Sequence, residues 1–133
     1  MPITDTLMTR PLILVVDDMG SVRSVLARAL LDAGYNVLTA SEASDALRLL
    51  DRLPARPDLA VIDLYMPHGP GEALAAELSR RHPGLPLVFL SAFGHHPDAV
   101  LPGLLFEKPV RLGALCRTIA HMLFLTAGAA LMP

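Results

Sequence analysis

Five residues with side chains suited to phosphoryl chemistry each close or follow an apolar stretch of the sequence. They are Asp17, Asp18, Asp63, Ser91 and Lys108. A carboxylate can attack phosphorus as a nucleophile and form an acyl phosphate. A serine hydroxyl can donate a hydrogen bond to a phosphoryl oxygen, and a lysine ammonium offers that oxygen a point charge. If these residues converge, the sequence predicts a phosphoryl-transfer site.

The three aspartates also form a candidate metal site. Carboxylates held close together raise one another's pKa values unless a cation lies between them. An all-oxygen ligand set with this charge suits a hard divalent ion, so we expect Mg²⁺ or Mn²⁺. Such an ion, together with Lys108, would offset the charge on a transferring phosphoryl group.

Apolar periodicity divides the chain into alternating strands and helices. Strands are expected at 12–16, 36–40, 59–62, 85–90 and 104–106. Helices are expected from Gly20 to Gly34, from a cap at Ser41 as far as Pro54, around residues 74–78, and from Arg111 to about Leu125. The alternation predicts an α/β fold with a doubly wound, five-stranded parallel sheet. In such sheets ligands bind outside the carboxyl ends of the strands, where the five candidate residues lie.

One crossover of this sheet is unusually short. Only 12 residues separate Ser91 from Leu104, and they include Gly94, Pro97 and Pro102. A parallel crossover with its helix normally takes a dozen residues or more. The fourth helix is therefore expected to be short or absent.

Length and composition limit the class of protein. The chain has 133 residues, 53% of them apolar and 18% charged, with a formal net charge of −2. We expect one domain at 11–125, an extension at 1–10 and a tail at 126–133. The charge balance argues against nucleic-acid binding, and the apolar C-terminal stretch is too short to span a bilayer. A single cysteine, Cys116, gives no reason to expect an oxidising compartment, so a cytoplasmic location is expected.

Four motifs at these strand ends resemble the receiver domain of two-component response regulators: Val15-Val16-Asp17-Asp18, Asp63-Leu64-Tyr65-Met66-Pro67 with Gly71, Ser91-Ala92, and Lys108-Pro109. The resemblance covers about residues 11–125. Each motif is weak alone, but together, in this order and spacing, they are specific. The resemblance implies a flavodoxin-like fold with strand order 2-1-3-4-5.

The resemblance also implies a role for each site residue. Asp63 would accept the phosphoryl group, with Ser91 and Lys108 as further catalytic residues. Asp18 would bind Mg²⁺ directly, Asp17 through water, Asp63 as a further ligand, and Tyr65 through its backbone carbonyl. The Lys108-Pro109 bond, often cis in relatives, is one where proline lowers the cis penalty.

The implied partner is a sensor histidine kinase or a histidine phosphotransfer protein that donates the phosphoryl group from phosphohistidine. The domain would catalyse its own phosphorylation and dephosphorylation, and would not be a turnover enzyme on a small-molecule substrate. Its output would be a switch in protein–protein interactions with a downstream protein target, and the chain would be a monomer or weak dimer.

The candidate switch residues are Ser91, Ala92 and Phe106. Most receivers have an aromatic residue three positions before the lysine, but that position is Leu105 here. Phe106 would point to the opposite face of a regular strand, which argues against the usual aromatic switching. The short crossover resembles a group of stand-alone receivers in which a loop replaces the fourth helix. We expect this loop, at 92–101, to become ordered on phosphorylation as Ser91 moves toward the phosphoryl group.

Other functions with the same fold fit the residues less well. A phosphohydrolase of the haloacid dehalogenase type needs a second acid two positions after its nucleophile, where this chain has Met19 or Gly20. A flavin carrier would need a phosphate-binding loop where Asp18 lies. A scaffold without phosphorylation would be expected to lack one of the acids or the lysine. A stand-alone output protein, a phosphate sink in a relay and a receiver cut from a longer regulator remain alternatives.

Overall fold

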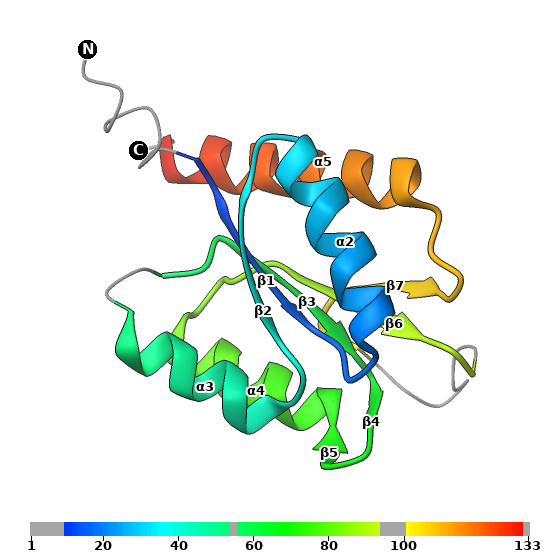
Figure 1. The fold of residues 1–133 in the computed structure, drawn as a ribbon. Helices are drawn as coiled ribbons and strands as arrows, with labels where there is room; N and C mark the ends of the chain where they lie inside the picture. The colour runs from blue at the N-terminus through cyan, green and yellow to red at the C-terminus, as the bar shows by residue number, and fades with distance from the viewer. Residues whose placement is uncertain (1–9, 54–55, 94–100, 132–133) are drawn as a thin grey trace.

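A five-stranded parallel sheet lies at the centre of the fold, covered by helices on both faces (Figure 1). The computed structural model describes residues 10–53, 56–93 and 101–131. The sheet strands are β1 (Leu12–Val16), β2 (Asn36–Ala40), β3 (Leu59–Asp63), β6 (Leu87–Ser91) and β7 (Leu104–Glu107). Their order is β2-β1-β3-β6-β7, which confirms the predicted flavodoxin-like order.

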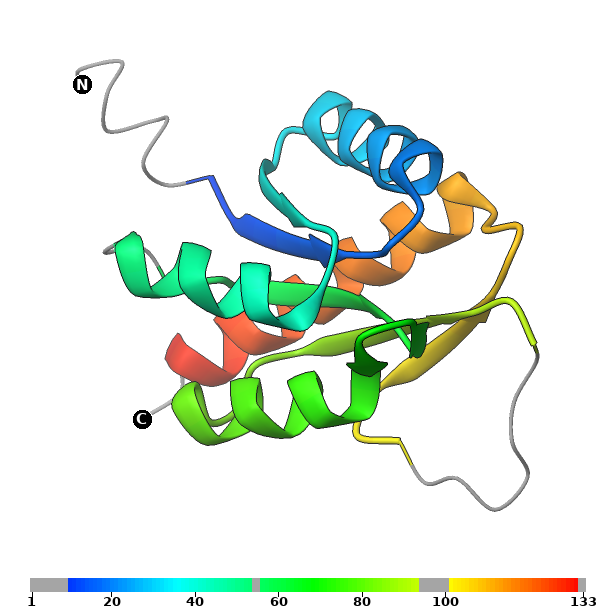
Figure 2. The ribbon, with the colours of Figure 1, turned by 60° about the horizontal axis from the view of Figure 1, so that its bottom comes forward.

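Four helices cover the sheet in the part of the chain that is described: α2 (Gly20–Asp32), α3 (Ala43–Arg52), α4 (Gly71–Arg81) and α5 (Leu112–Leu131). Helices α2 and α5 lie on one face, and α3 and α4 on the other (Figures 1 and 2). None of these helices is long and apolar enough to cross a membrane.

Two apolar clusters hold the layers together, because alternate residues of each strand point to opposite faces. On one face, Leu14, Ile62 and Phe89 pack with α3 and α4. On the other, Val15 and Val61 pack with α2 and α5. The central strands β3 and β6 are buried along their whole length, as continuous apolar runs in a doubly covered sheet should be.

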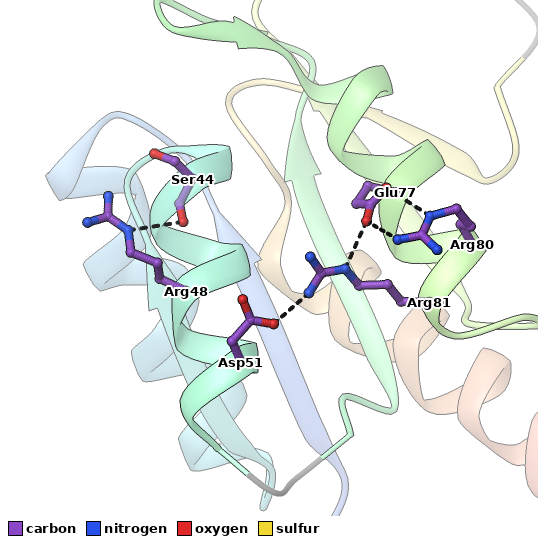
Figure 3. A network of polar contacts seen from close by, with 6 residues as sticks. All are labelled: Ser44, Arg48, Asp51, Glu77, Arg80 and Arg81. Carbon is purple, nitrogen blue, oxygen red and sulfur yellow. Dashed lines mark hydrogen bonds and ion pairs between the residues drawn. The ribbon is translucent and has the colours of Figure 1, made fainter.

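Ion pairs join α3 to α4 at the surface. Arg81 of α4 lies 2.8 Å from Asp51 of α3 and 2.9 Å from Glu77 of its own helix (Figure 3). Arg80 also pairs with Glu77, and these arginines hold the pKa of Glu77 at about 2, below its usual range. The two helices are thereby tied together on the side of the sheet away from α2 and α5.

Three local features differ from the sequence prediction. The last helix runs to Leu131, beyond the predicted end near Leu125, so residues 126–131 of the expected tail are helical. The second helix begins at Ala43, and the Ser41 hydroxyl does not cap it but donates to Asp45 at 3.1 Å. The Pro- and Gly-rich segment after β3 contains a small hairpin of two-residue strands, β4 (Tyr65–Met66) and β5 (Gly69–Pro70), which are too short to predict.

The short fourth crossover is described only at its two ends. Residues 92–93 and 101–103 contain no helix. Residues 94–100, which include most of the loop expected to order on phosphorylation, lie outside the described residues.

Candidate functional site

The register of the sheet brings the candidate residues together at the carboxyl ends of its strands. Val16 of β1 pairs with Ile62 of β3, so the next residues lie side by side: Asp17 directly follows β1, and Asp63 is the last residue of β3. On the far side of β3, Ser91 at the end of β6 pairs with Glu107, directly before Lys108. Each residue follows an apolar strand that is anchored in the core, so its backbone position is fixed by burial of the strand.

Three carboxylates and one ammonium group meet at this edge. Carboxylate oxygens of Asp17, Asp18 and Asp63 all lie within 4.8 Å of one another. Asp17 is fully buried and Asp63 is 2% exposed, whereas Asp18 is exposed to solvent. Lys108 Nζ lies 2.7 Å from Asp17 Oδ2 and 3.3 Å from Asp63 Oδ2. The lysine therefore bridges the two buried carboxylates.

Backbone amides orient the two buried aspartates. The Met19 N–H donates to Asp17 Oδ1 at 2.9 Å, and the Tyr65 N–H donates to Asp63 Oδ1 at 3.2 Å. Each bond closes a two-residue turn directly after a strand. In both aspartates this leaves Oδ2 as the oxygen that faces Lys108.

Burial changes the protonation of the site. Desolvation raises the pKa of Asp63 to about 6, with a further increase from the nearby charge of Asp17. The hydrogen bond from Tyr65 and the charge of Lys108 act in the opposite direction but are outweighed. Burial lowers the pKa of Lys108, yet its pairs with Asp17 and Asp63 raise it above the ordinary value overall. Lys108 is thus charged at neutral pH, and Asp63 is mostly ionised above pH 6.

The donor set fits a hard divalent cation. Three carboxylates from two neighbouring strand ends provide oxygen ligands, and Asp18 opens the cluster to solvent. A single lysine cannot neutralise three carboxylates, so the site carries excess negative charge that a divalent ion would compensate.

Close packing beneath Asp63 explains one residue of the motif. A Cβ added to Gly71 would lie 2.2 Å from the Asp63 carbonyl oxygen and 2.9 Å from the Ile62 side chain. Only glycine lets α4 begin this close to the end of β3. Gly71 belongs to the sequence motif, but its contact with the Asp63 backbone is visible only in three dimensions.

An exposed aromatic pair lies beside the acidic site. The rings of Tyr65 and Phe93 meet edge to face, with centroids 5.1 Å apart. Tyr65 also lines a pocket of about 470 Å³ together with Asp18 and the β4–β5 hairpin. The partner of Tyr65 could not be found from sequence, because Phe93 follows a different strand.

The candidate switch residues lie in different surroundings. Ser91 is fully buried, and its Oγ accepts a hydrogen bond from the Phe93 N–H at 3.2 Å. Ala92 is exposed. Phe106 packs in the cluster beneath α2 and α5, whereas Leu105 packs on the opposite face, as strand alternation predicts. The Lys108-Pro109 peptide bond is cis.

Comparisons with known proteins indicate the same family as the sequence motifs. The family model of the response regulator receiver domain matches residues 13–101. Among curated proteins, the chain is 39% identical over 88 residues to the transcriptional regulatory protein GlrR of Escherichia coli (strain K12), a match that covers 66% of this chain and 19% of GlrR. It is 33% identical over 118 residues to the sensor kinase CckA of Brucella abortus, covering 84% of this chain and 12% of CckA. The chain thus spans a fifth or less of the length of these relatives.

Solved structures of receiver domains have the same fold as this chain. The receiver domain of the hybrid histidine kinase CckA superposes with a TM-score of 0.73 at 28% identity, covering 84% of this chain and 98% of that one. A CheY-like receiver domain protein from Methanospirillum hungatei JF-1 gives a TM-score of 0.81, covering 91% of this chain and 99% of the other, and at 21% identity it supports the fold alone. With its sheet order, its strand-end acids and these matches, the chain belongs to the response regulator receiver domain family, whose members accept phosphoryl groups in two-component signalling.

Proposed function

We propose that Asp63 is the residue of this receiver that accepts the phosphoryl group. The observation that carries the proposal is the position of Lys108 Nζ, 3.3 Å from Asp63 Oδ2 within a cluster of three carboxylates. With a pKa of about 6, the Asp63 carboxyl is largely ionised at neutral pH and so available as a nucleophile. Asp17 is already committed to Lys108 at 2.7 Å and is fully buried, which makes it a poorer nucleophile.

The proposed reaction is transfer from phosphohistidine to the carboxylate. A carboxylate oxygen of Asp63 attacks phosphorus, the phosphorus–nitrogen bond breaks, and its electron pair stays on the donor imidazole. The product is an acyl phosphate, which water later hydrolyses. Lys108 is held at the site by Asp17 and would pair with a phosphoryl oxygen after transfer. The domain would act on itself and would not turn over a small molecule.

A divalent cation, Mg²⁺ or Mn²⁺, belongs to the same proposal. Asp17, Asp18 and Asp63 would hold it, with the Tyr65 carbonyl as a further oxygen ligand. When bound, the ion would supply positive charge that stabilises the transferring phosphoryl group. Exposure of Asp18 leaves a route for the ion to reach the two buried carboxylates.

The conformational response would begin at Ser91. Ser91 is buried at the end of β6, where its Oγ accepts a hydrogen bond from the Phe93 N–H, and after phosphorylation its hydroxyl would donate to a phosphoryl oxygen in place of its present arrangement. Ser91, Ala92 and Phe106 are the residues through which we propose that phosphorylation changes the β6–β7 side of the molecule. Phe106 lies in the cluster under α2 and α5, so any movement of it would be passed to those helices.

The phosphoryl donor would approach over an apolar groove next to Lys108. This groove has a volume of about 270 Å³, runs between α2 and the start of α5, and includes Val22, Val25, Pro109 and Leu112. Val25 is 53% exposed. A helix that carries the phosphohistidine of a sensor kinase or phosphotransfer protein could cover these apolar residues while its imidazole reaches Asp63. The downstream target would be a protein bound after phosphorylation.

The proposed receiver unit is the predicted one, residues 11–125, which contains every residue of the site. A cytoplasmic location is part of the proposal, since the single cysteine Cys116 suits a reducing compartment.

The proposal is tested by locating the phosphorylated residue. The protein is incubated with acetyl phosphate and Mg²⁺, its intact mass is measured, and the acyl phosphate is reduced with borohydride before peptide mapping. We expect one phosphoryl group, a modified peptide that contains Asp63, and no modification of Asp63→Asn or of protein treated with a chelator. Asp32→Asn, which changes an exposed carboxylate on α2, should be modified like the parent. Modification of Asp17 or Asp18, or full modification without a divalent ion, would refute the proposal.

A further inference from the structure

A third pocket lies at the carboxyl end of the edge strand β2, between α2 and α3. Its volume is about 340 Å³, and its polar lining consists of Arg23, Thr39, Ser41, Asp45, Arg48 and Arg52. None of these residues belongs to the acidic site, and the family chemistry described above uses none of them. The pocket gathers three guanidinium groups from two helices that are separated in the sequence.

The charges in the pocket do not cancel. Arg48 pairs with Asp45 at 2.9 Å, which offsets one positive charge with the one carboxylate of the lining. Arg23 donates a hydrogen bond to the uncharged carbonyl oxygen of Asp17 at 2.7 Å. Arg52 makes no ion pair with any residue that the structure describes. Arg23 and Arg52 therefore line one pocket without an ion-pair partner among the described residues.

Two features make the pocket more than a basic surface. The bond to the Asp17 carbonyl fixes the half-buried Arg23, so little ordering is needed before it can bind an anion. Leu49 gives the wall an apolar area beside the arginines, and the volume lies within the range of small-ligand pockets. Guanidinium groups bind phosphate oxygens well because their N–H donors match the geometry.

We propose that this pocket binds a small phosphate monoester, with the phosphate between Arg23 and Arg52 and the organic part against Leu49. A phosphate monoester carries close to two negative charges at neutral pH and could pair with both guanidinium groups that lack an ion pair, those of Arg23 and Arg52. An extended acidic peptide fits less well, because the arginines line a single pocket of about 340 Å³ and the lining includes the carboxylate of Asp45.

The test is a titration of the full chain with phenyl phosphate and, separately, with inorganic phosphate. Binding is measured by calorimetry, and amide chemical shifts locate the site, in buffer free of divalent ions so that the acidic site does not contribute. We expect saturable binding of phenyl phosphate, with shifts at the end of β2, in the first turn of α2 and in the last turn of α3. Arg52→Gln should weaken this binding about tenfold or more, because it removes one charge-assisted contact.

The matched control is Arg80→Gln, which removes the same charge from α4, far from the pocket lining. It should change the affinity less than twofold. The urea midpoint of Arg52→Gln should equal that of the parent, since Arg52 is exposed and unpaired in the described part of the chain. Equal weakening by the two variants, or no saturation, would overturn the proposal. Equal affinity for inorganic phosphate would show that the pocket does not recognise the organic part of an ester. Binding of a hexaglutamate peptide, without binding of phenyl phosphate, would overturn the proposal in favour of an acidic protein partner.

Discussion

Replacement of Asp63 by asparagine should stabilise the metal-free protein at neutral and alkaline pH. Asp63 is 2% exposed, and desolvation raises the pKa of its carboxyl from 3.8 to about 6. In the unfolded chain the same carboxyl ionises freely. The ionised group is therefore less stable in the folded protein than in the unfolded chain, and its neutral isostere does not carry this cost.

The magnitude follows from the pKa shift. A difference of about two pH units corresponds to about 3 kcal/mol, since each unit is worth about 1.4 kcal/mol. The folded state binds this proton more tightly, so the associated stability is fully present below pH 3.8 and is lost as pH rises through about 6. Asp63→Asn should then be about 3 kcal/mol more stable than the parent at pH 8, and nearly equal to it at pH 3.5. Asparagine keeps an oxygen that can accept the Tyr65 N–H, and Lys108 keeps its pair with Asp17.

The assay is urea denaturation of both proteins at pH 3.5 and pH 8, in buffer free of divalent ions. Asp32→Asn is the control, because Asp32 forms only an exposed pair with Arg28, and its change should stay below about 1 kcal/mol. Added Mg²⁺ should stabilise the parent more than Asp63→Asn, because the ion binds the folded state through the acidic cluster.

Two results would refute this reasoning. If Asp63→Asn were no more stable than the parent at pH 8, burial of the ionised carboxylate would not be the cost that the structure indicates. If a gain of similar size persisted at pH 3.5, it would come from packing or hydrogen bonding and not from the charge.

Three further predictions concern residues around the site. Lys108→Met leaves the buried Asp17 carboxylate without its counter-charge, so it should lower the free energy of unfolding, measured with urea at pH 8, by about 3 kcal/mol. A loss below about 1 kcal/mol would contradict the bridging role of Lys108. Gly71→Ala should lower the free energy of unfolding by about 2 kcal/mol, because the added methyl would lie 2.2 Å from a backbone carbonyl oxygen of β3. In the control Gly113→Ala in α5 the methyl meets only a flexible side-chain end at 3.4 Å, so that change should be neutral or stabilising, and equal effects of the two variants would contradict the close approach at Gly71. Tyr65→Ala removes the aromatic cover beside the acidic site and should speed hydrolysis of the acyl phosphate several-fold, followed by intact mass after removal of the donor; an unchanged lifetime would argue against shielding.

The sequence alone determined the fold class, because five short apolar runs alternate with helical periodicity and that alternation predicts a parallel, doubly wound sheet. The strand order was implied only by the resemblance of the motifs to receiver domains, and the structure confirms it. The sequence predicted the ends of helices less reliably. The predicted end of α5 near Leu125 was wrong because the residues that follow are mostly small or apolar, and one glycine within a helix costs only about 1 kcal/mol. Ser41 has the side chain of a helix cap, but its hydroxyl donates to Asp45 instead.

The sequence also determined which residues form the candidate site, since each one directly follows or closes a strand whose burial fixes its position. The tertiary structure alone decided how these residues differ. Asp17 and Asp18 are neighbours in the chain and their carboxylates lie in one cluster, yet only Asp17 is buried, because it directly follows the buried end of β1 and pairs with Lys108. Likewise, no local pattern in the sequence shows that the Lys108 ammonium lies closer to Asp17 than to Asp63.

The arginine pocket is the clearest example of a feature that the sequence does not predict. Arg23 and Arg52 are 29 positions apart in the sequence, and nothing in either local pattern links them. They line one pocket because α2 and α3 pack on opposite faces of the sheet at its β2 edge. Apolar periodicity in the chain is enough to specify which elements form, but charges that meet around a sheet edge depend on packing angles and side-chain directions that only the folded structure defines.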